Sequence, residues 1–536
     1  MISTRGLDLL PKLESAFADN NWDELSKLLS PREFATVELG DLIAHQVLAK
    51  VAYILTVEDS VVPESIRIAC LKCLGNSCVN GYKYTENLCG EDVRDRYFSS
   101  LYASLGKSIR NEGYSTENPC PYESHFPYEG VAEWSSNYII CCNLDMELLS
   151  NQLEILRLTI QFLCNLFTFS CKDSTSPHQY VKPKCLNNTG LKNCIMKAMQ
   201  CEQLPLIRAS CIFIHNALKE LPGHYFTLEE EIRLCLMVMK PVRAGFGSAK
   251  DALLHLLHHT NVLRDAYDTL TMDDKLYLLE LIYNEISETV HQADVVNTFS
   301  KGTVEFLCER FRKRSDLVLK TVDTYLDEME PTELVILLDT IGTLTASISE
   351  KYSFVKSDKS LLINCTYLLK SIHMVGRESE NMFTPLQKLS DVAPAARGIT
   401  IDEKLKENFS AQVSREEMLK NDPQTHPAFG FKAGLIRVIG NMSYRNRMCQ
   451  DMLREMEAIP LLLDCCNIDG RNPLIMQWSI LGLRNLCERN QENQKIIENC
   501  TKVGTVENSV LREMGVTLHE DEDGKRVGIV PLPRKD

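Results

Sequence analysis

The sequence predicts an all-α protein that folds as an armadillo- or HEAT-like, right-handed superhelical solenoid. Three observations support this prediction. Residues 446–500 form one complete repeat of three helices, similar helix ends recur along the chain, and their spacing is close to multiples of one repeat. The chain has 536 residues, 44% of them apolar, which is enough to bury a large core. A stack of repeats would bury that core as one continuous body.

The repeat at 446–500 is predicted to contain three consecutive helices. An amphipathic helix runs through Met456, a second apolar helix opens at residues 459–461, and a third opens at Pro473 and runs through Leu486. Proline suits the first turn of a helix because the amide proton that it lacks would have no partner there. The third helix is apolar nearly all round, so we expect neighbouring repeats to cover both of its flanks.

Helices that end in apolar residues followed by asparagine recur along the chain. The five asparagines are Asn76, Asn165, Asn216, Asn441 and Asn485. Asn441 and Asn485 are 44 residues apart, and the other intervals are close to one, two or five repeats. Because armadillo and HEAT repeats are about 40–47 residues long, we expect about ten repeats. Gly75 and Gly440 stand before two of the asparagines and indicate close approach of a neighbouring helix, since glycine costs a helix roughly 1 kcal/mol.

The predicted organisation has three parts. Residues 1–428 hold armadillo-like repeats with loop insertions at about 111–136, 172–190 and 376–427, residues 429–502 hold the C-terminal repeats, and residues 503–536 form a tail or hairpin. The third insertion is expected to contain a helix at about 402–419. Residues 516–518 and 527–530 flank an Asp523-Gly524 turn signal, which is typical of a β-hairpin. A disordered acidic tail is the alternative.

The composition limits the classes of function. The formal net charge is −15 and the pI is near 5.4. This argues against nucleic acid as a partner, because such binding rests on Lys and Arg that displace counterions from phosphates. The first residues lack the apolar segment of a signal peptide, and polar residues interrupt the apolar stretch 158–171, so no membrane insertion is expected. The 21 cysteines are then expected to be reduced, as in cytoplasmic proteins.

The segment from Phe429 to the end of the chain resembles a known protein family. The resemblance is strongest over the stretch FKAGLIRVIGNMSYRNRMCQDMLREMEAIPLLLDCCNIDGRNPLIMQWSILGLRNLCERNQENQ. The combination of an IGN helix, a QD-x-x-RE helix, IPL-x-L-x-CCNID and W-x-I-x-x-x-RNLCE-x-NQ is similar to the C-terminal domain of the ataxin-10 family, over about 70 residues. One departure is visible, since Met476-Gln477 stands where the family tends to have Arg-Glu.

The resemblance implies an all-helical, non-catalytic armadillo-like scaffold that needs no cofactor. It implies a cytoplasmic location, in the cytosol and perinuclear region with the centrosome or midbody as further sites. It also implies roles in cytokinesis, neurite outgrowth and neuronal survival. The implied partners are a G-protein beta subunit, the nucleocytoplasmic GlcNAc transferase and mitotic kinases. Apart from the resemblance, a homo-oligomer is a further expected form of association.

The recurring asparagines, together with Arg437, are the candidate partner-binding residues. A side-chain amide both donates and accepts hydrogen bonds, so it can bind the backbone of an extended peptide in a solenoid groove. The alternative interpretation is that each asparagine ties its helix to a loop or to the adjacent repeat.

The positions four residues before the asparagines distinguish two kinds of armadillo groove. Armadillo nuclear-import receptors have a tryptophan there, whereas this chain has Lys72, Gln161, Ile212, Arg437 and Leu481. A groove for basic localisation signals is therefore not expected, and an armadillo protein of nuclear transport or chromatin is the alternative function. If Lys72 and Arg437 face the groove, they favour an acidic or phosphorylated partner.

A metal-dependent enzyme is a less favoured alternative. It would use a histidine cluster on one predicted helix, His255, His258 and His259, or a cysteine cluster, Cys70, Cys73, Cys78 and Cys89. No nearby acid completes a hydrolytic zinc site, and a helical core explains the cysteines without a metal. No nucleophile, zinc-protease or kinase motif is found, so we predict no catalytic and no metal-binding residues.

Overall fold

A computed structural model describes most of the chain. The described residues are 3–5, 8–35, 41–43, 45–57, 62–87, 127–144, 148–167, 178–219, 225–259, 261–290, 299–321, 330–347, 349–378, 381–385, 426–467, 469–500, 512, 515–520 and 527–532. The chain divides into two compact units, Met1–Ala266 and Tyr267–Asp536. Each unit is described by itself.

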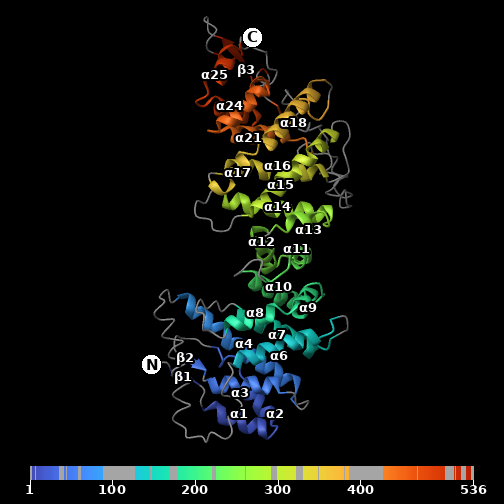
Figure 1. The fold of residues 1–536 in the computed structure, drawn as a ribbon, viewed down its shortest axis with the longest axis vertical. Coiled ribbons are helices and arrows are strands. Elements are labelled where there is room, and N and C mark those ends of the chain that lie inside the picture. The colour runs from blue at the N-terminus through green and yellow to red at the C-terminus, as the bar shows by residue number, and fades with distance from the viewer. Residues whose placement is uncertain are drawn as a thin grey trace, which may run out of the picture. The chain divides into compact units, whose positions relative to one another are not determined.

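The first unit consists of helices and one small sheet (Figure 1). Its helices are α1 (Leu9–Ala18), α2 (Trp22–Leu28), α3 (His45–Thr56), α4 (Glu64–Asn87), α6 (Pro127–Cys141), α7 (Ser150–Phe167), α8 (His178–Leu186), α9 (Thr189–Ala198), α10 (Leu204–Leu218), α11 (Leu228–Arg243) and α12 (Gly247–His259), with α13 (Leu263–Tyr267) at the division. The strands β1 (Ser3–Arg5) and β2 (Asp41–Ile43) pair in parallel, which the sequence pattern did not predict.

Four helices, α4, α7, α10 and α12, stack side by side through the first unit. The central helix α7 shows why the sequence folds this way. Its buried residues include Ile155, Leu158, Phe162 and Leu163, which point in several directions around the helix. Helix α4 covers one flank of α7 and α10 covers the other. The apolar side chains of α7 are therefore buried on both flanks and are not exposed to water.

The second unit is also helical, with a hairpin near its end (Figure 1). Its elements are α14 (Met272–Thr289), α15 (Lys301–Arg314), η1 (Ser315–Thr321), α16 (Glu330–Ala346), η2 (Glu350–Tyr352), α17 (Ser353–Lys356), α18 (Lys359–Glu378), α21 (Phe431–Ser443), α22 (Arg447–Glu455), α23 (Ala458–Asp464), α24 (Ile475–Cys487), α25 (Gln491–Glu498), β3 (Val516–Glu520) and β4 (Val527–Pro531). Helices α14, α16, α21 and α24 stack in that order.

The predicted all-α solenoid class is confirmed, and so is the C-terminal hairpin. Strands β3 and β4 pair antiparallel with Val516 opposite Pro531 and Glu520 opposite Val527. In the part of the chain that the structure describes, no helix is both long and apolar enough to cross a membrane.

The predicted end of the last repeat needs two corrections. The third helix begins at Ile475, because Pro473 lies in a turn and Leu474 takes a left-handed conformation with φ 62°. The second flank of this helix is not covered, since Ile480 is 56% exposed. Helix α24 is the last of the stacked helices in the described residues, so α21 packs on one flank only.

The predicted loop insertions are shorter than expected where the structure describes them. Helix α6 begins at Pro127, α8 occupies His178–Leu186, and α18 continues to Glu378. The remainder of the first insertion and the predicted helix at 402–419 lie outside the described residues. The domain boundaries at 428 and 502 stay predictions.

Two glycines bring α21 and α24 close together. A side-chain Cβ at Gly440 would lie 3.1 Å from the Cα of Gly482, which belongs to the neighbouring helix backbone. This confirms the close approach expected at Gly440. Because a backbone cannot move aside as a flexible side chain can, Gly440 has no room for a larger residue, whereas a Cβ at Gly482 would lie 3.7 Å from the Gly440 Cα, an ordinary contact distance.

We therefore expect Gly440→Val to destabilise the second unit by about 1–3 kcal/mol, since overpacking forces the two helix backbones apart. Thermal unfolding of the full chain should show a lower midpoint for the transition that includes α21 and α24. Gly130→Val is the matched control, because Gly130 lies in helix α6 with nothing within 4 Å of an added Cβ. Equal effects of the two substitutions would contradict the packing argument.

Candidate interaction surface

Asparagine side chains link the stacked helices in both units. In three of these links, the asparagine Nδ2 donates a hydrogen bond to a backbone carbonyl of the preceding stacked helix. The carbonyl belongs to the residue just before the recurring asparagine of that preceding helix. These bonds run from Asn165 to Gly75 (3.2 Å), from Asn216 to Cys164 (3.1 Å) and from Asn485 to Gly440 (3.0 Å). Every link uses the same two positions of the repeat, so the carbonyl is placed where the next asparagine needs it.

Of the other two asparagines, Asn441 makes the equivalent bond, whereas Asn76 bonds to a turn that follows α2. Asn441 Nδ2 donates to the Gly342 carbonyl (3.1 Å) and to Thr345 Oγ1 (3.3 Å) on α16. Thr343, which follows Gly342, therefore occupies the asparagine position of α16, and the sequence pattern missed this repeat because threonine replaces asparagine. Asn76 Nδ2 donates to the Pro31 carbonyl (2.8 Å). We call these five links the asparagine ladder.

The asparagine ladder uses the donor group that a bound peptide would need. Asn216 and Asn485 are 9% and 5% exposed, and the Nδ2 group of each already donates a hydrogen bond inside the chain. A buried amide without a partner would cost about 1–3 kcal/mol. These contacts support the interpretation that the asparagines tie adjacent repeats together. Direct contact of the ladder asparagines with a partner stays a prediction.

The two cations that precede ladder asparagines by four residues are paired within the chain. Lys72 Nζ lies 3.3 Å from Glu154 Oε1. Arg437 Nη2 donates to the Asp339 carbonyl (2.8 Å) and lies 3.6 Å from the Asp339 carboxylate. Burial raises the pKa of Asp339, and Arg437 opposes that rise. The Arg437 guanidinium also lies 6.0 Å from the Trp478 ring centroid. Binding of an acidic partner by these two cations stays a prediction.

A second pair of asparagines begins the helices that follow α21 and α24. Asn446 Oδ1 accepts from the Cys449 amide (3.3 Å) at the start of α22, and Asn490 Oδ1 accepts from the Asn493 amide (3.2 Å) at the start of α25. Each bond satisfies an amide that has no partner within its own helix, so both asparagines are helix caps.

The residue before each capping asparagine is an arginine with a left-handed backbone. Arg445 has φ 51° and Arg489 has φ 55°, a conformation that costs an ordinary residue about 1–2 kcal/mol. The sequence carries a signal for both, because Asn-x-x-x-Arg-Asn occurs at 441–446 and again at 485–490. The repeat pattern of asparagines includes only the first asparagine of each motif, so it does not single out these two arginines.

Gln450 joins the ends of α21 and α24 to α22. Its Nε2 donates to the carbonyls of Ser443 (3.3 Å), Asn485 (2.9 Å) and Glu488 (3.2 Å), and the residue is only 2% exposed. The fully buried Asn493 donates its Nδ2 to the Gln450 carbonyl (3.3 Å). The last carbonyls of a helix lack partners within the helix, so the glutamine of the QD-x-x-RE motif has a structural role.

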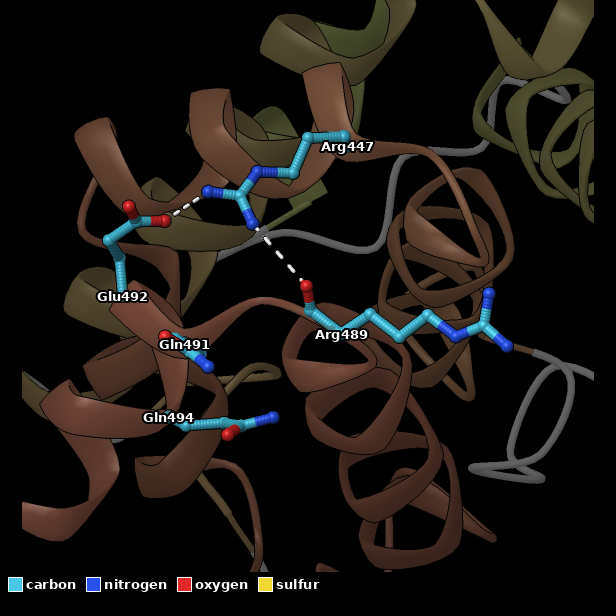
Figure 2. A pocket seen from close by; sticks show the side chains of 5 residues that line it. All are labelled: Arg447, Arg489, Gln491, Glu492 and Gln494. Carbon is cyan, nitrogen blue, oxygen red and sulfur yellow. Dashed lines mark hydrogen bonds and ion pairs between the residues drawn. The ribbon is translucent and has the colours of Figure 1, made fainter.

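A polar surface hollow of about 410 Å³ lies beside the two arginine loops (Figure 2). We call it the arginine hollow; it is lined by Arg447, Arg489, Gln491, Glu492 and Gln494. Arg447 pairs with Asp451 (3.0 Å) and with Glu492, and its Nη1 donates to the Arg489 carbonyl (3.5 Å). Figure 2 shows the Arg447 side chain extended toward Glu492, whereas the Arg489 side chain runs away from that pair.

The histidine and cysteine clusters lie in helix interiors. Burial lowers the pKa of His255, which lies 6.2 Å from the His215 ring. Burial raises the pKa of Cys70 to about 12 and also raises the pKa of Cys73. The His259 side chain and Cys89 lie outside the described residues. Within the described ranges, no three His, Cys, Asp or Glu side chains are placed to hold one metal ion.

The asparagine ladder predicts the effect of removing one link. Asn485→Ala should lower the free energy of unfolding by about 1–3 kcal/mol, because it removes a buried hydrogen bond and leaves a space. Thermal unfolding of the full chain measures the change. Asn499→Ala is the control, since Asn499 is exposed at the end of α25. An unchanged midpoint for Asn485→Ala would show that the link contributes nothing.

Comparison with known proteins identifies the segment that carries these features. Residues 431–528 match the family model described as the spinocerebellar ataxia type 10 protein domain. This range contains α21 to α25, the last ladder link and the arginine hollow.

Ataxin-10 proteins of several organisms are similar to the chain. Ataxin-10 of Xenopus tropicalis is 30% identical over 272 residues, 51% of this chain and 50% of that protein. Human ataxin-10 is 28% identical over 266 residues, 49% of this chain and 50% of that protein. The ataxin-10 homolog of Dictyostelium discoideum is 41% identical over 107 residues, 20% of this chain and 17% of that protein.

The match to these relatives is partial, since the chain spans about half the length of the first two. An engineered protein with a solved crystal structure aligns with 89% of this chain and 98% of its own at 8% identity and a TM-score of 0.32, too low to bear on function. The predicted resemblance is nevertheless confirmed by both the family model and the curated relatives. Residues 431–528 are thus similar to the C-terminal domain of the ataxin-10 family, and about half of the chain is similar in sequence to ataxin-10 proteins.

Proposed function

We propose that the chain is a non-catalytic armadillo-repeat scaffold of the ataxin-10 type, which binds signalling and cell-division proteins. The observation that carries this proposal is the asparagine ladder, whose last link, from Asn485 to Gly440, lies within the family's C-terminal domain. Directional bonds between successive helices hold the exposed surface in one arrangement. A pre-organised surface binds with a smaller loss of conformational freedom, which is what a scaffold requires.

The candidate partners come from the resemblance to the family. They are a G-protein beta subunit, the GlcNAc transferase and mitotic kinases, in processes that include cytokinesis and neurite outgrowth. The proposed location is the cytosol and perinuclear region, with the centrosome or midbody during division. Self-association is a further proposed property.

The sequence pattern disfavours the nuclear-transport alternative. No tryptophan stands four residues before a ladder asparagine, and the Nδ2 groups that would bind a peptide backbone donate within the chain. Binding of a basic localisation peptide that is lost on changing Asn441 and Asn485 to alanine would favour this alternative.

Elemental analysis of the purified full chain tests the enzyme alternative separately. Zinc at one equivalent or more per chain, retained through dialysis and gel filtration, would favour a metal-dependent activity and contradict a pure scaffold. We expect sub-stoichiometric zinc, because burial keeps the thiols of Cys70 and Cys73 protonated and thiolate is the form that binds zinc.

Direct binding of purified proteins tests the scaffold proposal. The immobilised full chain should bind at least one of the G-protein beta subunit, the GlcNAc transferase and a mitotic kinase with a Kd of about 1 μM or below, as is typical of specific complexes. Serum albumin, another acidic protein, is the control for non-specific binding. Binding of all three candidates no tighter than that of albumin would contradict the proposed partners.

A further inference from the structure

Three aromatic side chains gather in the first unit where α1 packs against α2 and α3. Phe17 lies near the end of α1, Trp22 begins α2 and Tyr53 lies near the end of α3. The Phe17 ring centroid is 6.2 Å from that of Trp22 and 5.9 Å from that of Tyr53, at interplanar angles of 73° and 74°. We call these three rings the aromatic corner. None of them is fully buried and Tyr53 is 39% exposed, so the corner lies at the surface.

The turn between α1 and α2 fixes the position of Trp22. Asn20 has a left-handed backbone with φ 50°, and the Asn21 amide donates to the Ala16 carbonyl (2.9 Å). Asn21 Oδ1 accepts from the Glu24 amide (3.2 Å) and so caps α2. Asparagine adopts the left-handed conformation more readily than most residues and is a preferred helix cap. These two asparagines therefore hold the first residue of α2 beside the end of α1.

A cation of the same chain already occupies the aromatic corner. Lys50 Nζ lies 4.9 Å from the Phe17 centroid and 5.2 Å from the Tyr53 centroid. Lys50 and Tyr53 are three residues apart on α3 and therefore share one face of that helix. Among the residues that the structure describes, the ammonium group has no hydrogen-bond acceptor and no ion-pair partner. Ring faces are thus its main contacts.

The surroundings of the aromatic corner favour a cation but hold Lys50 only weakly. Burial lowers the pKa of Lys50, and the charge of Glu14 opposes that effect. The ammonium group therefore loses contact with water here, and its flexible stem allows it to turn outward. Residues 8–28, which form α1 and α2, contain five Asp and Glu and two Lys. This excess of negative charge attracts cations from outside the chain.

We propose that the aromatic corner binds a trimethylated lysine side chain of a partner protein, which displaces the ammonium group of Lys50. The inference rests on the proposed scaffold function, because it names the chemistry by which one partner is recognised. Aromatic ring faces attract a quaternary ammonium group, as in the aromatic cages that bind methylated lysine. Rings that meet at steep angles, as Trp22 and Tyr53 do with Phe17, surround such a group on more than one side.

The missing acceptor at the aromatic corner favours trimethyllysine over unmodified lysine. A primary ammonium group has three N–H donors, and Lys50 finds no acceptor for them among the described residues. A quaternary ammonium group has no N–H donor, so it leaves no hydrogen bond unmade at this site. Its methyl groups also bury apolar surface against the rings, which the ammonium group of lysine does not.

Three peptide libraries test the proposal with the full chain. Each contains fluorescein-labelled nine-residue peptides with one fixed central residue, which is trimethyllysine, unmodified lysine, or the uncharged tert-butyl analogue that has the shape of trimethyllysine. The immobilised wild-type chain should retain several times more of the trimethyllysine library than of either other library, because ring faces attract the charge and the methyl groups together. Equal retention of the trimethyllysine and tert-butyl libraries would overturn the proposal, and so would stronger retention of the lysine library.

Two variants test whether the aromatic corner is the site. Tyr53→Leu should lower retention of the trimethyllysine library about fivefold, because it removes one ring face. Lys50→Ala should raise that retention severalfold, because it removes the ammonium group that competes for the rings. A purely structural role of Lys50 would not produce this gain, so unchanged or lower retention in Lys50→Ala would contradict the proposed displacement.

Two matched controls separate the site from general effects. Tyr367→Leu replaces an exposed tyrosine on α18, and Lys27→Ala removes an exposed lysine on α2 with the same change of charge as Lys50→Ala. Both should leave retention within about twofold of wild type. Circular dichroism of each variant should match that of wild type, and the comparison of libraries on the wild-type chain depends on no variant. Equal losses in the two tyrosine variants, or equal gains in the two lysine variants, would overturn the proposal.

The scaffold proposal and this inference fail in different ways. If purified partner proteins bind the wild-type chain while the trimethyllysine library shows no preference, the aromatic corner is not a methyllysine site and the scaffold proposal stands. If no purified partner binds but the trimethyllysine library is retained through Tyr53, the aromatic corner is a methyllysine site and the proposed partners are wrong.

Discussion

The hydrogen bond from an asparagine side chain to a carbonyl of the preceding helix is the interaction on which the stacked arrangement depends. Apolar burial supplies more energy, since a fully buried leucine or phenylalanine contributes about 1.5–3 kcal/mol and a hydrogen bond about 0.5–1.5 kcal/mol net. Apolar contact does not fix how far one helix slides or turns against the next, however. The bond does, because a shift by one residue turns the helix by about 100° and moves the carbonyl away from the amide. Asn165, Asn216 and Asn485 each bond to the equivalent carbonyl of the preceding helix. Each of these helix pairs therefore has the same register.

The C-terminal domain adds a second layer of constraint to this register. Gly440 and Gly482 let two helix backbones approach, and Gln450 collects the carbonyls left over where those helices end. These buried contacts hold the loops that precede α22 and α25, and the loops in turn hold Arg445 and Arg489 in left-handed conformations. This combination of rigid buried polar groups and exposed arginines suits the proposed binding role, because a fixed backbone lowers the cost of ordering a long side chain on binding.

The fold class followed from the period of the asparagines, but the pattern had clear limits. It missed α16 because Thr343 stands at the position of a ladder asparagine and makes no such bond. It placed a loop over residues 172–190 because Pro183 and several polar residues obscured α8, whose packing against α6, α7 and α9 sustains it. It expected cover on both flanks of α24, which depends on a neighbour that the helix's own residues do not specify. For the site, residue type predicted that asparagines matter, whereas the pairing of Arg437 with Asp339 depends on which helices meet in space.

Native-state hydrogen exchange of the full chain with Asn216→Ala tests most directly whether a ladder asparagine couples two repeats. Asn216 belongs to α10, and its side chain donates to Cys164 of α7. If the bond couples the two helices, amides in both α7 and α10 lose protection together, by about tenfold for a loss of about 1.4 kcal/mol, while α1 and α2 keep theirs. A loss of protection confined to α10 would contradict the account, because it would mean that the asparagine stabilises its own helix and not the contact between repeats.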